Sequence, residues 1–537
     1  MSDVETTGGR SRLLRSSAVV GLGTAISRLT GFGRVAALAY ALGFTRVTDT
    51  YNLANETPNM VYELLLGGVL TATFLPLFVQ YFERDDDDST SAVLTVSVVF
   101  LVLLTIAGIV AAPWIVRLYT IQVHGATRVA QRHVATNLLR WFMPQMFFYG
   151  ITALATSLLN ARRRFAAPAF APILNNVVVI AIFLSIPHIV SGPLTLTRLE
   201  HDYSLIVLLG LGTTAGIAAM ALVLLPPLWR AGVRLHWKLQ LRHPAVRRVI
   251  SLSGWTFGYV ATNQVALWVV LVLANGRVGG VSAYLGAYVF FQLPHGLLAV
   301  SIITTVAPEL ASAVTRNDFA ELRERFAVGL RLTIAVVLPA AIGFIALSRP
   351  LVAGLLQRGA FSSASAASTS RALAGFAVGL VAFSVYLFTL RLFYSMQDTR
   401  TPFLINLFEN AANIVLALAL FPAFGVTGLA LAFSGAYILA AVLALFVARR
   451  RLGSLDLAAL GIGLPRIFLA SAVSGFIAWV VAEAIGWSDG LRALEGLFAG
   501  GTTFVVVMVV TCVVLRVPEV AILKDALLRR SPTARGV

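Results

Sequence analysis

Apolar runs long enough to cross a lipid bilayer follow one another along nearly the whole chain of 537 residues. A membrane-spanning helix needs about 20 mainly apolar residues. Here 58% of all residues are hydrophobic and only 12% are charged, a composition that excludes a water-soluble globular domain. The sequence therefore predicts an all-α polytopic membrane protein.

The apolar runs, read against charged residues and Pro/Gly punctuation, predict fourteen transmembrane helices. An even number places both termini on one side of the membrane. Most basic residues fall in the tails and connections on that side, so both termini, residues 1–16 and 517–537, are expected to be cytoplasmic. The predicted spans lie near residues 17–42, 50–82, 91–119, 131–160, 167–190, 203–230, 247–275, 282–312, 325–348, 370–397, 402–422, 426–449, 463–486 and 492–516.

The net charge of +17 would suggest a nucleic-acid partner in a soluble protein. In this chain the basic residues set topology instead, so no nucleic acid is expected. The two lysines, Lys238 and Lys524, each follow an apolar residue, which excludes a Gly-Lys-Ser/Thr phosphate loop and ATP binding by that route. The single cysteine, Cys512, excludes an intramolecular disulfide. No cofactor or metal is predicted.

An internal repeat divides most of the chain into two similar parts. Residues 160–176 align without gaps with residues 394–410, and Pro58 inside the second span matches Pro294 inside the eighth. An offset of six spans predicts two six-helix lobes in parallel orientation, as in transporters that rock two bundles about a central site. We expect an N-lobe at 17–230, a C-lobe at 247–449 and two extra helices at 463–516.

Two arginines interrupt the first span, in the sequence from Ser27 to Arg34. An arginine at the bilayer centre costs roughly 2.5–3.5 kcal/mol, so Arg28 and Arg34 are expected to face a watery cavity and bind an anionic ligand. The alternative is that one of them reaches the interface or pairs with an acid on a neighbouring helix.

The second span begins with an unusually polar stretch and contains a proline, Pro58, that is expected to kink or break the helix. Its polar residues recur at spacings of three and four, which places them on one helix face. Glu56 and Glu63 are either counter-ions for the two arginines or groups that contact substrate, and both roles remain open. The predicted substrate-binding residues here are Asp49, Asn55, Glu56, Asn59 and Glu63.

The second half offers two further candidates. Gln292 lies next to Pro294, in the counterpart of the polar stretch, and is a predicted substrate contact. The eleventh span carries four side chains with oxygen atoms, which either coordinate a monovalent cation or form hydrogen bonds between helices. These residues are Asn406, Glu409, Asn410 and Asn413.

These motifs resemble the amino-terminal signature of MviN/MurJ proteins, and the stretches 62–70 and 291–296 resemble actinobacterial members. The resemblance implies a MOP-superfamily fold: two six-helix lobes in a V around a cationic cavity, with 463–516 forming a groove for a lipid tail. Arg28, Arg34 and Asp49 match the family's cavity arginines and first-loop acid. Many members have an acid directly after the second arginine, where this chain has Val35, and arginines in the second span, where it has Tyr62 and Glu63. Where they have an arginine in the eighth span, it has Val289 or a neighbour, so its cationic cavity must be rebuilt or thinner.

The predicted function is therefore a flippase that moves lipid II to the outer leaflet of the bacterial cytoplasmic membrane, a transporter and not an enzyme. Guanidinium groups bind pyrophosphate oxygens in bidentate fashion, and membrane potential or a monovalent cation would supply the energy. The expected partners are lipid II, membrane lipids and cell-wall synthesis proteins. The alternatives are a flippase for another polyprenyl-linked saccharide and a membrane-embedded glycosyltransferase or polymerase.

Overall fold

The computed structural model describes the backbone of residues 3–64, 71–233, 236–240, 242–246, 254–453 and 458–517. Every regular element in these residues is a helix. The predicted all-helical membrane fold is confirmed in this respect. The predicted tail beyond residue 517 lies outside the described residues.

The chain forms two compact units. The first contains residues 1–282 together with the short segment 359–361, and the second contains 283–358 and 362–537. The helices of the first unit are α1 (Asp3–Leu42), α2 (Arg46–Tyr62), α3 (Thr71–Glu83), α4 (Asp87–Tyr119), α5 (Gly125–Phe142), α6 (Pro144–Ala161), α7 (Ala166–Ile189), α8 (Leu196–His201), α9 (Tyr203–Leu222), α10 (Leu225–Arg230) and α12 (Gly254–Ala274).

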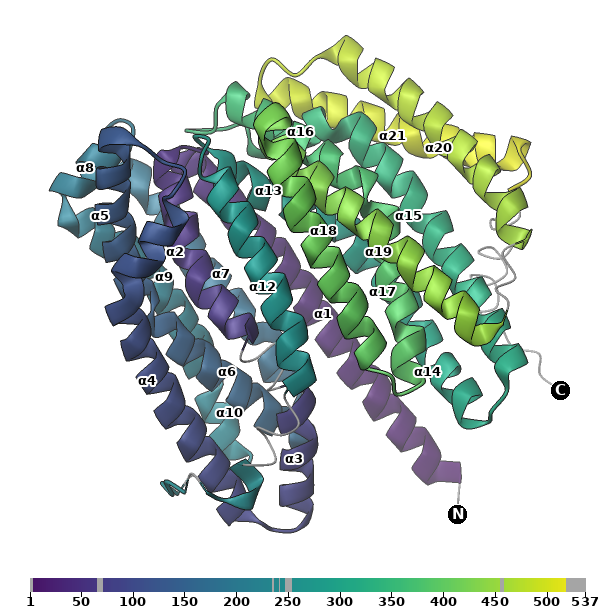
Figure 1. Cartoon of the computed structure of the whole chain (residues 1–537), viewed down its shortest axis with the longest axis horizontal. Helices are drawn as coiled ribbons and strands as arrows, with labels where there is room; N and C mark the ends of the chain where they lie inside the picture. Colours follow the sequence, from purple (N-terminus) through teal and green to yellow (C-terminus); the bar gives the residue numbers. More distant parts are fainter. Residues whose placement is uncertain are drawn as a thin grey trace. The chain divides into compact units, whose positions relative to one another are not determined.

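Helix α13 (Gly280–Pro294) begins at the end of the first unit and continues into the second, where a short π-helical turn (His295–Ala299) follows it. Helices α20 and α21 pack against each other and against α15, as Figure 1 shows. The remaining helices of the second unit are α14 (Val300–Thr315), α15 (Phe319–Leu356), α16 (Ser363–Val378), α17 (Leu380–Ser395), α18 (Arg400–Phe424), α19 (Val426–Leu452), α20 (Ala458–Ile485) and α21 (Gly490–Val514).

Among the described residues, eleven helical segments are long and apolar enough to cross a membrane, and a helix pair bent by 46° makes a twelfth. Helices α1 and α2 are not among them. The two arginines lower the hydropathy of α1, and α2 has only 17 residues, many of them polar. Helix α1 also begins at Asp3, well before the predicted start at residue 17.

Two predicted single spans are interrupted at points that local chemistry explains. In the span at 131–160 the helical hydrogen bonding is interrupted between α5 and α6, where Pro144 lacks a backbone N–H, but Gly125–Ala161 still forms one segment able to cross a membrane. The span at 370–397 bends at Gly379, where a Cβ atom would lie 2.5 Å from the Cα atom of Ser434. By contrast, α2 runs through Pro58 and ends at Tyr62, so this proline does not terminate the helix.

The internal repeat reappears in the backbone of two turns. The α6–α7 turn has Arg163 in the left-handed region (φ 57°), and the α17–α18 turn has Gln397 there (φ 58°). Both turns are closed by an equivalent pair of backbone N–H to C=O hydrogen bonds. In the α6–α7 turn they run from Arg163 to Asn160 (2.9 Å) and from Arg164 to Leu159 (2.8 Å). In the α17–α18 turn they run from Gln397 to Tyr394 and from Asp398 to Phe393 (both 3.0 Å).

A second pair of turns repeats in the same way. Asp85 before α4 and Asn317 before α15 both adopt positive φ (51° and 55°). The next residue in each case, Asp86 or Asp318, accepts a hydrogen bond from the third residue beyond it and so caps the helix. The repeat therefore extends from sequence to helix-turn geometry.

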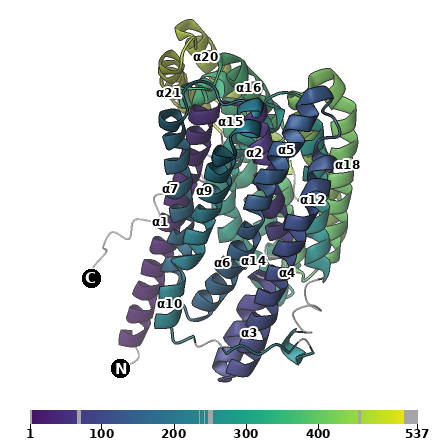
Figure 2. The same ribbon diagram turned by 90° about the vertical axis from the view of Figure 1, so that its left-hand side faces the viewer.

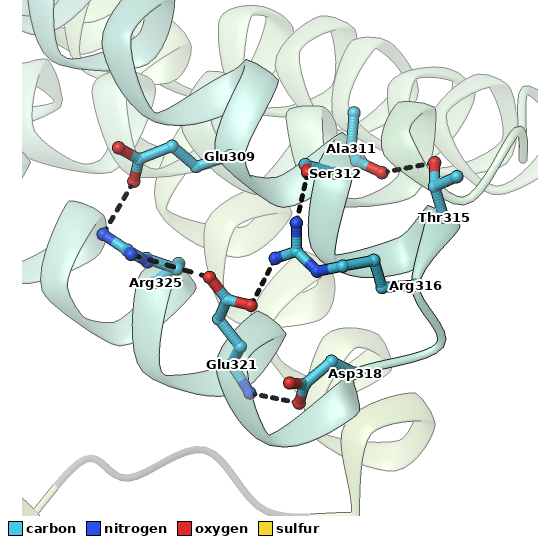
Figure 3. A network of polar contacts seen from close by, with 8 residues as sticks. All are labelled: Glu309, Ala311, Ser312, Thr315, Arg316, Asp318, Glu321 and Arg325. Carbon is cyan, nitrogen blue, oxygen red and sulfur yellow. Dashed lines mark hydrogen bonds and ion pairs between the residues drawn. The ribbon is translucent and has the colours of Figure 1, made fainter.

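Charged side chains brace the α14–α15 turn in the second unit (Figure 3). Arg325 contacts Glu309 at 3.2 Å and Glu321 at 3.5 Å, and Glu321 also pairs with Arg316. These groups are partly exposed, so each pair contributes about 1 kcal/mol or less.

Helices α1 and α7 lie side by side in the first unit (Figures 1 and 2). A Cβ atom on Gly23 would lie 2.9 Å from the Cβ of Ala169, so glycine permits this close approach. Further along, the Asn176 side-chain amide donates to the Ser27 carbonyl (3.2 Å) and to the Thr30 hydroxyl (3.0 Å). These contacts hold the arginine-bearing part of α1 against α7.

We expect Gly23→Ala to lower the thermal unfolding midpoint of the purified protein, because the added methyl group overpacks the α1–α7 contact at a cost of about 1–3 kcal/mol. Gly21→Ala is the matched control, since a Cβ atom added at Gly21 would have no atom within 4 Å, and helix propensity alone should leave it neutral or stabilised. Equal midpoints for the two variants would contradict the close packing.

Candidate functional site

The two arginines of α1 occupy different environments. Arg28 is exposed and Arg34 is half-buried. The two arginines are six positions apart in the sequence. In an α-helix this spacing places their side chains about 120° apart around the axis and about 9 Å apart along it. Within the part of the chain that the structure describes, neither arginine forms an ion pair. Both guanidinium groups are therefore available to an anionic ligand.

Arg34 has electrostatic partners on α2 and α6. Its guanidinium interacts electrostatically with the Glu56 carboxylate and with the hydroxyl groups of Tyr51 and Tyr149. The Asn59 side chain donates a hydrogen bond to Glu56. The structure thus brings three predicted residues, Arg34, Glu56 and Asn59, into one cluster.

Tyr62 and Tyr149 form an aromatic pair beside this cluster, with ring centroids 4.5 Å apart. Sequence reasoning singled out Tyr62 only as a departure from the family pattern and missed Tyr149, which lies in a long apolar run without a distinguishing motif. Glu63 follows Tyr62 and is exposed, whereas the buried Asn55 side-chain oxygen has no hydrogen-bond partner. An aromatic wall next to a cationic group offers a surface for both sugar and phosphate.

Asp49 is fully buried and its carboxylate is occupied by protein donors. It accepts hydrogen bonds from the backbone N–H of Gly279 (2.6 Å) and from the backbone N–H and hydroxyl of Ser282 (3.0 and 2.9 Å). Gly279 has a positive φ of 73°, and a Cβ atom there would lie 2.4 Å from the Phe44 carbonyl oxygen. In this structure Asp49 therefore holds the start of α13 and does not contact the Arg34 cluster.

A second polar network surrounds Asn275, just after α12. Arg46 donates to its backbone carbonyl (2.5 Å), and Gln131 of α5 donates to its side-chain oxygen (2.9 Å). The Asn275 amide in turn donates to the Tyr119 carbonyl at the end of α4 (3.0 Å). Together with Asp49, this network joins α5 to the start of α2, the ends of α4 and α12 and the start of α13.

The other predicted residues lie in the second unit. Gln292 is exposed on α13 and forms a side-chain hydrogen bond with Tyr288. The four polar residues of α18 are all buried, with exposed fractions of 1–5%. One oxygen each of Glu409 and Asn413 has no hydrogen-bond partner. The α18 residues Asn406, Glu409, Asn410 and Asn413 therefore remain candidates for binding a small cation.

No group of three or more His, Cys, Asp or Glu side chains in the described residues is arranged to hold a metal ion. What the first unit does present is a half-buried guanidinium beside amide, carboxylate and phenol groups. A guanidinium in such a setting can bind an anionic group through charge-assisted hydrogen bonds.

We expect Asp49→Asn to destabilise the protein, because the new amide group places a donor opposite the N–H groups of Gly279 and Ser282. Leaving a buried N–H donor without an acceptor lowers the free energy of unfolding by about 1–3 kcal/mol. The loss would be measured as a lower thermal unfolding midpoint. Asp85→Asn is the control, since Asp85 is exposed and asparagine tolerates its positive φ. An unchanged midpoint for Asp49→Asn would show that the carboxylate does not hold α13.

Comparison with known proteins identifies the family. A family model described as "Lipid II flippase MurJ" matches residues 38–494. The probable lipid II flippase MurJ of Rhizobium meliloti is 30% identical over 431 residues, covering 78% of this chain and 77% of that protein. The lipid II flippase MurJ of Burkholderia cenocepacia is 28% identical over 399 residues, covering 73% and 75%.

Solved structures agree in fold. A MurJ structure in an inward closed conformation superposes with a TM-score of 0.73 at 22% identity, covering 93% of this chain and 99% of that one. An inward-facing MATE transporter of the MOP superfamily gives a TM-score of 0.65 at 14% identity, covering 81% and 99%. With the family model matching most of its length, the chain belongs to the MurJ family of lipid II flippases.

Proposed function

We propose that this chain translocates lipid II across the cytoplasmic membrane, as a transporter and not an enzyme. The observation that carries the proposal is the family match over residues 38–494, supported by relatives named lipid II flippase MurJ. Arg28 and Arg34 precede the matched segment, so their proposed role rests on their place in the first unit.

The Arg34 cluster is the proposed headgroup site. A pyrophosphate needs cationic donors, and a guanidinium offers two parallel N–H groups to its oxygens. Arg34 is half-buried among Glu56, Tyr51 and Tyr149, where reduced water access strengthens such contacts. The exposed Arg28 would meet the same anion as it enters or leaves. Asn55, Asn59, Glu63 and Gln292 are the further proposed contacts.

Alternating access by two lobes is the proposed transport movement. The repeated turn geometry supports two parallel six-helix lobes at 17–230 and 247–449 within a set of fourteen spans. The apolar, exposed faces of α20 and α21, with Val505, Val509 and Phe476 among their outward residues, support a lipid-tail role for 463–516. The distribution of basic residues supports cytoplasmic termini.

A monovalent cation on α18, the membrane potential, or both would supply the energy. Moving one charge through 100 mV is worth about 2.3 kcal/mol, and an inside-negative potential favours outward movement of an anionic headgroup. Glu409 would supply the charge of the cation site, with Asn406, Asn410 and Asn413 adding neutral oxygens. The unpartnered oxygens of Glu409 and Asn413 support this proposal.

We expect Arg34→Ala and Arg28→Ala to abolish lipid II translocation without preventing membrane insertion, because each removes phosphate-binding charge but no apolar length. Lysine at either position should retain more activity than alanine. The measurement is complementation of a flippase-depleted strain, scored for growth and lipid II accumulation at matched expression. Arg140→Ala, which removes an exposed arginine on α5, serves as the control. Full complementation by both alanine variants would refute the headgroup site.

Glu409→Gln should reduce the dependence of transport on a cation gradient, because the variant keeps the shape of the side chain but loses its charge. The measurement is lipid II translocation in proteoliposomes with imposed sodium or proton gradients. Glu483→Gln on α20 is the control, since that acid is exposed. If Glu409→Gln keeps its full response to both gradients and to potential, the α18 residues serve only to hold helices together.

A further inference from the structure

The two turns related by the internal repeat share a backbone but differ in charge. At the α17–α18 turn, one Asp398 oxygen accepts hydrogen bonds from the backbone N–H groups of Arg400 and Thr401, both at 3.0 Å. Its other oxygen pairs with Arg451 at 2.6 Å. The Asp398 carboxylate thus caps the first N–H groups of α18.

The environment of Asp398 favours its anionic form. Burial acts to raise the pKa of this carboxyl, but the hydrogen bonds from Thr401 and the interaction with Arg451 outweigh burial, and the pKa lies below its ordinary value. The position at the start of the helix is therefore one where an anion is stabilised.

The corresponding turn of the first unit has no such carboxylate. Arg164 occupies the place of Asp398, and Ala166 and Ala167 occupy the places of Arg400 and Thr401. Phe165 precedes α7 without a side-chain hydrogen bond to cap it. The start of α7 therefore lacks the side-chain acceptor that Asp398 supplies at the start of α18.

A surface pocket of about 490 Å³ opens at this position. Its lining includes the cationic Arg163 and Arg164 and the uncapped residues Ala166 and Ala167. Arg164 donates to the Arg230 carbonyl (3.1 Å), which restrains its side chain at the pocket. Neither arginine forms an ion pair with any acid in the described residues. Positive charge therefore meets a helix start without a side-chain cap, at the position where the equivalent turn of the second unit has a carboxylate.

Apolar surface adjoins the pocket. Val19 and Phe165 line it, and Leu22, one turn further along α1 than Val19, is 57% exposed. Trp229 on α10 is 68% exposed and lies two residues from the lining residue Pro227. Exposed tryptophan is typical of the level of lipid headgroups. An anion with acyl chains fits these surroundings better than a free ion does.

We propose that this pocket binds the phosphate of an anionic phospholipid, which takes the place that the Asp398 carboxylate holds in the repeat-related turn. Under the proposed topology the lipid belongs to the inner leaflet. The site is separate from the Arg34 cluster, and it would stabilise the α6–α7 turn against which α1 packs.

The test compares the full-length protein in phosphatidylcholine nanodiscs with and without phosphatidylglycerol, using the thermal unfolding midpoint and retention of labelled lipid. The capped variant, Arg163→Gln/Arg164→Asp, reproduces the residues of the second unit's turn and supplies an internal cap. The uncapped variant, Arg163→Gln/Arg164→Gln, removes the charges without adding a cap. The control Arg449→Gln/Arg450→Asp makes the same charge change as the capped variant at two exposed arginines of α19.

Phosphatidylglycerol should raise the thermal unfolding midpoint of the wild type and of the Arg449→Gln/Arg450→Asp control. Inorganic phosphate should leave both midpoints unchanged. Both pocket variants should bind the labelled lipid at least about fivefold more weakly, the loss expected from a single capping interaction. Without phosphatidylglycerol, the capped variant should be more stable than the uncapped variant. Equal weakening in the control, or unchanged binding in both pocket variants, would overturn the proposal. A matching response to inorganic phosphate would assign the pocket to a free anion instead.

Discussion

Polar groups without access to water must find partners inside the protein, and most features of this structure depend on that constraint. Backbone N–H and C=O groups meet it by forming helices, which are the only regular elements in the described residues. Charged side chains meet it in different ways. Asp49 is satisfied by donors at the start of α13, whereas Arg34 lies among polar groups without an ion pair within the described chain. Asp49 therefore has a structural role, whereas the Arg34 guanidinium is available to the proposed ligand.

The internal repeat shows how one backbone design carries two chemistries. Turns before α7 and α18 share their positive-φ residue and their hydrogen bonds, so the chain path does not depend on which side chains follow. Asp398 closes one turn internally, while Arg164 leaves the other open to an external anion. Divergence after duplication would thus create a binding site without altering the fold, because a helix start needs an acceptor but not a particular one.

The proposed headgroup site follows the same logic of substitution. The family resemblance leads to the expectation of further arginines in the second span, yet this chain has Tyr62 there, paired with Tyr149. A site with fewer cationic groups and an aromatic pair would bind a phosphosugar partly through contact between the rings and the sugar. Its affinity would then depend less on charge. Binding at such a site is expected to weaken less with added salt than binding at a site lined only by arginines.

The sequence by itself determined the class of fold, because apolar run length and arginine placement respond directly to the bilayer. It also revealed the repeat and the family resemblance, and it grouped Arg34, Glu56 and Asn59 among the candidate substrate-binding residues. Tertiary structure decided the rest. The family resemblance grouped Asp49 with the substrate-binding residues, but only packing showed that Gly279 and Ser282, more than two hundred residues away, occupy its carboxylate. Tyr149 and the uncapped start of α7 likewise became visible only in three dimensions, since a local pattern does not record which distant groups a side chain meets.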